Sequence, residues 1–255
     1  MNPPLDLTPG GWNVFVLYGA LHLVAVMVCA LLIAAPAVLG RAAGKHAAAA
    51  LRRTLAALAL AYWFAYAIWW NWHGVDWRGG LPLQLCDLNG LMAPVALLTG
   101  RRWARAALYF WTAALTLQVF IQPALTAGPA ALTFWAFWCS HTLIAACAVY
   151  DVAVSDFRPA WRDLGRALAL SAAYGALILP FDLLLGADYG FIGNPAPDLA
   201  VPPFVLMLGP WPQRAVILAA LVPLGFVAVL LPWRIAARRF VCAQPGTHDG
   251  KPRQS

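Results

Sequence analysis

The feature that most constrains this chain is a series of seven long apolar runs. They lie approximately at residues 12–40, 51–72, 82–100, 103–122, 131–151, 165–186 and 212–234. A helix needs about 20 apolar residues to cross the ~30 Å hydrocarbon core of a bilayer, and a backbone inside lipid must satisfy its own hydrogen bonds. With 62% hydrophobic and 11% charged residues, the chain is predicted to be all-α, a polytopic membrane helical bundle with seven transmembrane helices.

The distribution of basic residues predicts how these helices are oriented. Fifteen of the 17 Lys and Arg residues fall in four segments, at 41–53, 101–105, 158–166 and 234–253. The loops on the opposite side contain only Arg78 and Arg214. The positive-inside rule then places the N-terminus outside and the C-terminus in the cytoplasm. The net charge of +7 comes mainly from these loop residues, whose placement is explained by the membrane topology. No nucleic-acid partner is therefore expected.

The chain is predicted to hold one transmembrane domain, residues 1–240, followed by a disordered cytoplasmic tail, residues 241–255. No Lys or Arg precedes the first run and no small-residue cleavage site follows it, so this run is interpreted as an uncleaved span. The richness in Arg and Ala is typical of a GC-rich bacterial genome, which indicates a bacterial cytoplasmic (inner) membrane protein. No internal repeat is visible, which disfavours an inverted-repeat transporter. The sequence does not specify an oligomeric state.

Two loops on the outer side have distinct compositions. Trp69, Trp70, Trp72 and Trp77 crowd the end of the second run, as an interfacial aromatic belt would. The segment 186–212 is long, rich in proline and irregular. Irregular backbone is not tolerated in lipid, so we expect this segment to cap the bundle or to fold back into its mouth.

A polar cluster marks the start of the third run. Gln84, Cys86, Asp87 and Asn89 fall within six residues of one another. Polar side chains in a membrane span need internal partners and are functional candidates by default. Cys86 would lie about five residues inside the outer end of the span, or ~7 Å deep. We expect Cys86 to act as a nucleophile, and Gln84, Asp87 and Asn89 to contact the substrate.

Further candidates come from later runs. Gln118, His141 and Asp182 lie in the fourth, fifth and sixth runs, and all three would belong to the outer half of the bilayer. A thiolate is promoted by a helix N-terminal dipole or by an imidazole base, so Cys86 and His141 are the candidate catalytic pair. Asn89 could stabilise an oxyanion, and Gln118 could orient His141 or bind a headgroup. Asp182 is a further candidate for substrate binding.

Each of these residues also has a purely structural interpretation. A cysteine in a membrane helix often fills packing space, and a lone histidine often hydrogen-bonds between helices. Asp182 could satisfy carbonyl groups that Pro180 leaves free. Cys139 lies about 200° from His141 on a helix, so the two cannot ligate one metal ion. With five cysteines, an odd number, and no ligand cluster, no disulfide framework, metal site or cofactor is predicted.

The order of several short motifs resembles a known family, the YwaF-like bacterial integral membrane proteins, which are related to the eukaryotic transmembrane protein 164 lipid acyltransferases. The resemblance runs from about Trp63 to Trp233. The matching segments are 81–88, 109–111 with 116–118, 140–141, 182–189 and 208–212.

This resemblance implies a function as well as a fold. In the eukaryotic relatives, the cysteine of the Leu-Cys-Asp motif and the histidine of the fifth-span motif are regarded as the catalytic pair of a phospholipid acyltransferase. These roles correspond to Cys86 and His141. The chain departs from the family pattern at Gln84, where histidine is usual, and at Asp188, where asparagine is usual, and an altered substrate could follow.

We therefore expect an integral membrane lipid acyltransferase or acyl hydrolase, acting on a membrane phospholipid or another acyl lipid in an outward-opening cavity. The alternative is a non-enzymatic transporter, receptor or lipid-binding protein that uses the same cavity. A haem protein is a third hypothesis, because His22 and His141 could lie at similar depth. A retinal protein is excluded, because neither Lys45 nor Lys251 lies in a run and no Schiff-base lysine is available.

Overall fold

The computed structural model describes residues 12–199 and 201–242, and this part of the chain is helical throughout its regular structure. Its α-helices are α1 (Ala20–Ala42), α2 (Lys45–Trp70), α3 (Leu85–Thr99), α4 (Arg102–Trp111), α5 (Leu132–Ala153), α6 (Trp161–Leu185), α7 (Pro203–Leu206) and α8 (Gln213–Cys242). A π-helix, η1 (Thr112–Thr116), and a 3₁₀-helix, η2 (Leu117–Phe120), extend α4, and a second 3₁₀-helix, η3 (Tyr189–Phe191), follows α6. The predicted tail lies almost wholly outside the described residues.

Each of the seven predicted runs contains helix, but the helices differ in length. Within the described residues, four are long and apolar enough to cross a membrane: α1, α5, α6 and α8. Helix α3 has 15 residues, and its length of about 22 Å is less than the ~30 Å of the hydrocarbon core. The protein is thus an all-helical, multi-pass integral membrane protein in which at least one element begins within the bundle.

The first predicted run is only partly helical. Helix α1 begins at Ala20, and the chain before it lies along residues 126–130. The Phe15 amide donates to the Thr126 carbonyl at 2.9 Å, and the Gly128 amide donates to the Asn13 carbonyl at 3.0 Å. A Cβ at Gly128 would collide with the Trp12 backbone, so glycine permits this pairing. The backbone partners offered by residues 126–130 replace those that a helix would supply.

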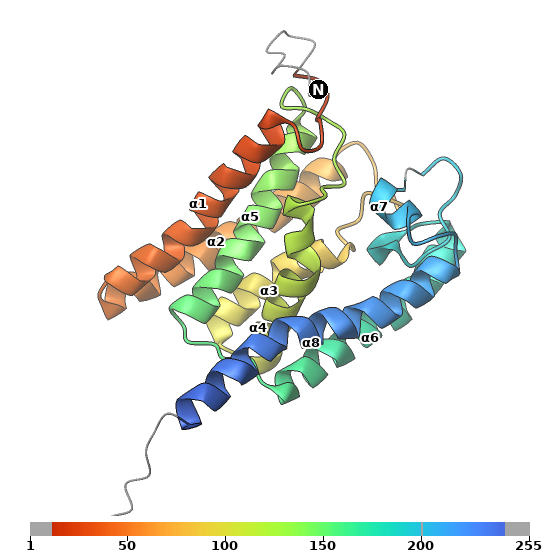
Figure 1. Cartoon of the computed structure of the whole chain (residues 1–255). Coiled ribbons are helices and arrows are strands. Elements are labelled where there is room, and N and C mark those ends of the chain that lie inside the picture. Colours follow the sequence, from red (N-terminus) through yellow and green to blue (C-terminus); the bar gives the residue numbers. More distant parts are fainter. Residues whose placement is uncertain (1–11, 200, 243–255) are drawn as a thin grey trace, which may run out of the picture.

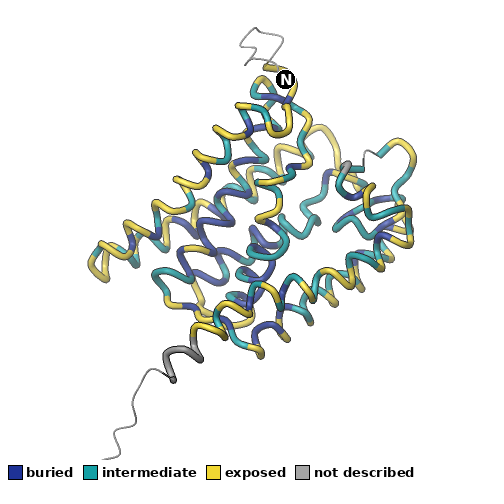
Figure 2. Tube along the Cα trace, in the orientation of Figure 1, coloured by how far each residue is buried: buried dark blue, intermediate teal, exposed yellow. Residues whose placement is uncertain are grey.

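The helices form two groups around a buried centre. Helices α1 and α5 lie side by side, α6 and α8 form a separate pair, and α3 and α4 stand between the two groups (Figure 1). Buried residues concentrate in α3, α4 and α5, whereas α1, α6 and α8 show long exposed stretches (Figure 2). Large apolar side chains on these stretches, such as Leu31 and Leu184, are 72% and 84% exposed. A surface of this kind is expected to face lipid.

The bundle packs tightly around α8 at one end. We call this the basic end, because it carries Arg102, Arg105 and Arg166, and we call the opposite end the loop end. Near the basic end, Phe226 and Leu230 of α8 are fully buried against α4 and α6. Toward the loop end, the same helix lines a cavity with Ala215, Leu218, Ala219 and Val222. Helix α8 therefore closes the bundle with one half and borders open space with the other.

Ion pairs hold the basic end together. The fully buried carboxylate of Asp163 accepts hydrogen bonds from Arg102, at 2.6 and 2.9 Å, and from Arg166, at 2.7 Å. It thereby joins α4 to the first turn of α6. Asp156 also pairs with an arginine, Arg158, but both of these side chains are at least half exposed. The two pairs share their chemistry and differ in burial.

This difference predicts unequal costs for the same substitution. Asp163→Asn should lower the free energy of unfolding by about 1–3 kcal/mol, because charge-assisted hydrogen bonds to two arginines weaken at a buried site. Asp156→Asn should change it by less than about 1 kcal/mol, since exposed ion pairs contribute little. Denaturant unfolding in detergent, followed by tryptophan fluorescence, measures both. Equal effects would show that burial does not set the strength of these pairs.

Candidate functional site

A cavity of about 980 Å³ opens in the loop-end half of the bundle. Its walls come from α2, α3, η1, η2, α5, α6 and α8 and from the segment 188–204. Most of the lining is apolar, and the polar lining residues include Gln84, Cys86, Asp87, Gln118 and His141. Its volume lies at the upper end of the range typical of small-molecule and lipid sites.

Cys86 lies in the first turn of α3. The helix begins at Leu85, so Cys86 is its second residue and not one buried five residues inside a span. From Cys86 to Thr99 the helix rises about 20 Å. The thiol therefore lies inside the bundle, at a helix N-terminus. The first amides of a helix have no intrahelical acceptor, so they can donate hydrogen bonds to a group that lies beside the thiol.

Asp87 fixes the turn that presents this cysteine. Its Oδ2 accepts a hydrogen bond from the Gln84 amide at 3.1 Å, as a residue in the first turn of a capped helix does. Its carbonyl oxygen accepts from the Trp63 indole at 3.0 Å, which ties α3 to α2. Asp87 borders the cavity, but its carboxylate is already engaged in the fold.

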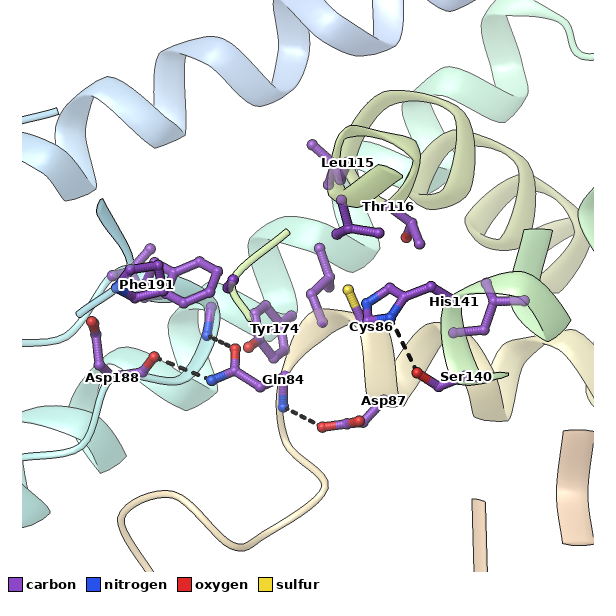
Figure 3. A pocket seen from close by; sticks show the side chains of 18 of the residues that line it. Gln84, Cys86, Asp87, Leu115, Thr116, Ser140, His141, Tyr174, Asp188 and Phe191 are labelled. Atoms are coloured by element: carbon purple, nitrogen blue, oxygen red, sulfur yellow. Dashed lines mark hydrogen bonds between the residues drawn. The ribbon is translucent and has the colours of Figure 1, made fainter. Parts of the chain in front are cut away.

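His141 lines the same cavity as Cys86. Both residues line it, and the Cys86 sulfur and the His141 ring point toward one another in Figure 3. The His141 Nδ1 lies 2.7 Å from the Phe137 carbonyl oxygen and 3.1 Å from the Ser140 hydroxyl. Because a carbonyl only accepts, Nδ1 carries the proton and Nε2 is the basic nitrogen. Within the described residues no hydrogen bond joins the thiol to the ring, and catalytic pairs are often loose before substrate binds.

A π-helical turn shapes the opposite wall. In η1 the Thr116 hydroxyl bonds to the Trp111 carbonyl, at 3.1 Å, and accepts from the Asn89 amide, at 3.4 Å. Thr116 and Cys86 both line the cavity, and both are labelled in Figure 3. Single π-turns inside helices are frequent at functional sites. This one places Thr116 in the lining of the same cavity as the candidate nucleophile.

Two predicted site residues lie outside the cavity lining. Asn89 is fully buried, and its amide donates to Thr112 at 3.0 Å and to Thr116 at 3.4 Å. Asp182 is also fully buried, and its Oδ1 accepts from the Tyr189 amide at 3.1 Å. In this structure Asn89 braces η1 against α3, and Asp182 holds the chain that leaves α6.

Gln84 and Gln118 border the cavity in different ways. The Gln84 Oε1 accepts from the Gly190 amide at 2.9 Å, and its Nε2 donates to the Asp188 carbonyl at 3.4 Å (Figure 3). Gly190 has φ +67°, and a Cβ there would collide with the Tyr174 ring. Gln118 is exposed, and its side chain makes no hydrogen bond in the described part of the chain. Its amide is therefore free to contact a ligand.

Two tyrosines that the motifs did not single out organise the mouth. The Tyr189 hydroxyl accepts from the Leu81 amide at 3.1 Å and donates to the Trp77 carbonyl at 3.2 Å. The Tyr174 hydroxyl donates to the Leu83 carbonyl at 2.9 Å. Both bond to the non-helical chain that leads into α3. The sequence signal that could have identified these tyrosines is the non-helical stretch before α3. Its backbone groups have no regular-structure partners and therefore need side chains to bond to.

The segment 186–212 folds against the cavity mouth, as expected. The Asp188 Oδ1 accepts from Arg214, at 2.9 Å, and from the Gly193 amide, at 3.0 Å. Arg214 also donates to the Gly193 carbonyl at 2.6 Å. Burial raises the pKa of Asp188, although the guanidinium of Arg214 opposes this effect. This ion pair, with side chains only 4% and 12% exposed, links the segment to the start of α8.

The His22 ring has no free nitrogen to bind a haem iron. The His22 Nδ1 accepts from the Tyr18 amide at 3.1 Å, so Nε2 carries the proton, which it donates to the Phe120 carbonyl at 3.0 Å. Both ring nitrogens are thus engaged with backbone groups, and an iron ligand needs one free. Within the described residues, no group of three or more His, Cys or Asp side chains is arranged to hold a metal ion.

The contacts of Gln84 predict a local change on substitution. Gln84→Leu should speed amide hydrogen exchange in residues 186–199 by about fivefold or more, because the Gly190 amide loses its acceptor. Gln118→Leu is the matched control, since the Gln118 side chain holds no part of that segment, and its exchange should equal that of the wild type. Exchange followed by mass spectrometry in detergent or nanodiscs measures both. Unchanged exchange in Gln84→Leu would contradict the anchoring role.

Comparison with known proteins agrees with this architecture. Residues 17–230 match the family model described as the TMEM164 family. No curated protein and no solved structure matches the chain. The family match covers most of the chain, including α1 to α7, most of α8 and every residue that lines the cavity. The chain therefore belongs to the TMEM164 family.

Proposed function

We propose that this protein is an integral membrane lipid acyltransferase or acyl hydrolase in which Cys86 is the nucleophile and His141 is the general base. The observation that supports the proposal is that a thiol in the first turn of α3 and a histidine whose Nδ1 is engaged by a backbone carbonyl line the same cavity. A lone cysteine or histidine would not suffice. Together they provide the two groups that a thioester mechanism needs.

The first half of the reaction forms a thioester. The His141 Nε2 removes the thiol proton, and the Cys86 sulfur attacks the carbonyl carbon of a lipid ester. The tetrahedral intermediate collapses by cleavage of the carbon–oxygen bond, and the departing alcohol takes its proton from the His141 imidazolium. The products are an acyl thioester on Cys86 and a lipid that lacks one acyl chain.

The second half returns the enzyme to its starting state. A hydroxyl group, from an acceptor lipid or from water, loses its proton to His141 and attacks the thioester carbonyl. The carbon–sulfur bond breaks, and the Cys86 thiolate regains the proton. An acceptor lipid gives acyl transfer and water gives hydrolysis. In both halves, the backbone amides of Leu85 and Cys86 lack intrahelical acceptors and can donate to the oxyanion.

The cavity walls support an acyl lipid as the substrate. One side is apolar and built from membrane helices, with Leu115, Val119, Leu168, Leu218 and Val222 among its residues. Burial of an acyl chain against such a wall is favourable by about 0.8 kcal/mol per CH₂ group. The polar residues Gln84 and Gln118 lie on the same cavity, where they suit an ester or headgroup. A membrane phospholipid or another acyl lipid has both parts.

The second candidate function is a non-enzymatic transporter, receptor or lipid-binding protein. It is favoured by the absence, within the described residues, of a hydrogen bond between Cys86 and His141. Such a protein would use the same cavity and would keep full function after Cys86→Ala. An enzyme would retain lipid binding but lose turnover.

We also propose the full topology. The seven helical segments from α1 to α8, with α4, η1 and η2 counted as one and the short α7 set aside, would cross a bacterial cytoplasmic (inner) membrane. The basic end would face the cytoplasm and the N-terminus the outside. The arginine-rich loops support this orientation. Residues 1–240 would then form one domain.

Thioester formation is the direct test of the nucleophile. Incubation with a phospholipid that carries an alkyne-tagged acyl chain should label the wild type, and neutral hydroxylamine should remove the label, as expected for a thioester. Cys86→Ala should abolish labelling, and Cys139→Ala should not, because Cys139 is exposed and does not line the cavity. Labelling that survives Cys86→Ala would overturn the proposed mechanism.

The role of His141 is tested by rate. His141→Gln should slow acylation of Cys86 by about 10²–10⁴-fold, the usual contribution of a general base. Ser140→Ala should have a much smaller effect, because the Phe137 carbonyl still holds the protonated Nδ1 at 2.7 Å. Single-turnover labelling with the tagged lipid compares the two variants. Similar rates for both would argue against His141 as the base.

Topology is tested by thiol accessibility in intact cells. A membrane-impermeant maleimide should modify Val75→Cys, whose position is exposed at the loop end. Arg162→Cys, exposed at the basic end, should react only with a permeant reagent. The wild type provides the background from native cysteines. The reverse pattern would invert the proposed orientation.

A further inference from the structure

Arg78 occupies an unusual position at the mouth of the cavity. Among the described lining residues, it is the one Arg or Lys side chain. It is followed directly by Gly79, Gly80 and Leu81, which also line the cavity, on the chain that leads into α3. The Arg78 side chain is 40% exposed. A cation at the rim of a largely apolar cavity is unexplained by the thioester chemistry.

The guanidinium of Arg78 is held in a carboxylate fork. Its Nη1 and Nη2 donate to the two carboxylate oxygens of Asp198 at 3.1 and 2.7 Å. This planar, two-bond geometry is the one in which arginine also binds phosphate. The neighbouring guanidinium holds the pKa of Asp198 below its usual range, so the carboxylate is charged at neutral pH. Asp198 belongs to the segment that folds against the cavity mouth.

In the ion pair of Arg78 with Asp198, another anion can replace the Asp198 carboxylate. Asp198 is 62% exposed, and ion pairs with this exposure contribute little to stability. The backbone around Arg78 is fixed, by contrast. Its amide donates to the Asp76 carboxylate at 3.0 Å, and the carbonyl of Trp77 accepts from Tyr189. A guanidinium on a fixed backbone, held by an exposed carboxylate, can change partners without rearrangement of the fold.

The other cation near the mouth is not free in this way. Arg214 is buried and is engaged by Asp188 and by the Gly193 carbonyl. Displacing Asp188 would leave a buried charge unpaired, which is costly. Among the described residues that line the cavity, Arg78 is therefore the cation that a ligand anion can reach.

We propose that Arg78 binds the phosphate of a phospholipid whose acyl chain lies in the cavity, and that Asp198 occupies the guanidinium until that phosphate replaces it. This inference rests on the proposed function, which it deepens by assigning the residue pair that would recognise the phosphate of the lipid. The phosphate accepts the two hydrogen bonds that Asp198 gives up. Release of Asp198 frees the covering segment at one of its attachments.

The two partners of the pair predict opposite effects on binding. Arg78→Gln should weaken binding of hexadecylphosphocholine by about tenfold or more, because a charge-assisted contact is lost. Asp198→Asn should strengthen binding, by up to about fivefold, because the internal competitor has lost its charge. If the pair were only a structural clasp, both substitutions would act in the same direction. Opposite signs therefore identify exchange.

The experiment measures binding of hexadecylphosphocholine to the full-length protein in nanodiscs, by titration against a fluorescent fatty-acyl probe. This lipid has no acyl ester, so its binding is independent of any acyl transfer to Cys86. Failure of the thioester mechanism would leave this result unaffected. Thermal midpoints of Arg78→Gln and Asp198→Asn should match that of the wild type, which separates binding effects from misfolding.

Two further ligands identify what Arg78 recognises. Hexadecylglycerol has the same chain without phosphate, and both variants should bind it like the wild type. Inorganic phosphate at millimolar concentration should not displace the probe, if the acyl chain is required. Equal loss of hexadecylglycerol and hexadecylphosphocholine binding in Arg78→Gln would overturn the proposal. Displacement of the probe by inorganic phosphate alone would replace a lipid site with a free-phosphate site.

Discussion

The structure depends on one constraint, that backbone polar groups within a membrane bundle need partners inside the protein. Helix α3 begins at Leu85, partway into the bundle, and the chain before it is not helical. Its carbonyl and amide groups are satisfied by side chains from other elements. Tyr174 bonds to Leu83, and Tyr189 bonds to Leu81 and Trp77. The result is a helix N-terminus that is buried within the bundle and open to a cavity. That is where Cys86 lies.

The same constraint explains why much of the polar cluster serves the scaffold. Asp87 caps the first turn of α3, Asn89 braces the π-turn of η1, and Asp182 holds the chain after α6. Gln84 has two roles. It borders the cavity, and it holds the segment around Gly190 by a hydrogen bond. Polar residues in a membrane span are costly unless paired, and here they pair with backbone groups or, at Asn89, with threonine hydroxyls. Cys86, His141 and Gln118 differ because atoms of theirs remain available to a ligand.

The proposed chemistry uses the two ends of the cavity differently. The pair Cys86 and His141 provides a nucleophile and a base, with the tautomer of His141 set by the Phe137 carbonyl and not by a carboxylate. The apolar wall of α6 and α8 suits an acyl chain, and the ion pair of Arg78 with Asp198 lies at the mouth. The open half of the bundle is where all three features meet. The packed basic end, with Asp163 and its two arginines, keeps the helices in register.

The sequence by itself determined the all-helical, multi-pass architecture, because seven apolar runs leave a membrane chain no other regular structure. It also singled out Cys86 and His141, since reactive side chains in such runs need a reason. It did not indicate that α3 begins at Leu85, that η1 is a π-helix or that Asn89 and Asp182 lie outside the cavity lining. Those outcomes depend on which partner each polar group finds among segments far apart in the chain. Only the tertiary structure brings Leu81 to Tyr189, Gln84 to Gly190 and Arg78 to Asp198, because hydrogen bonds between distant segments leave no periodic signal in a sequence.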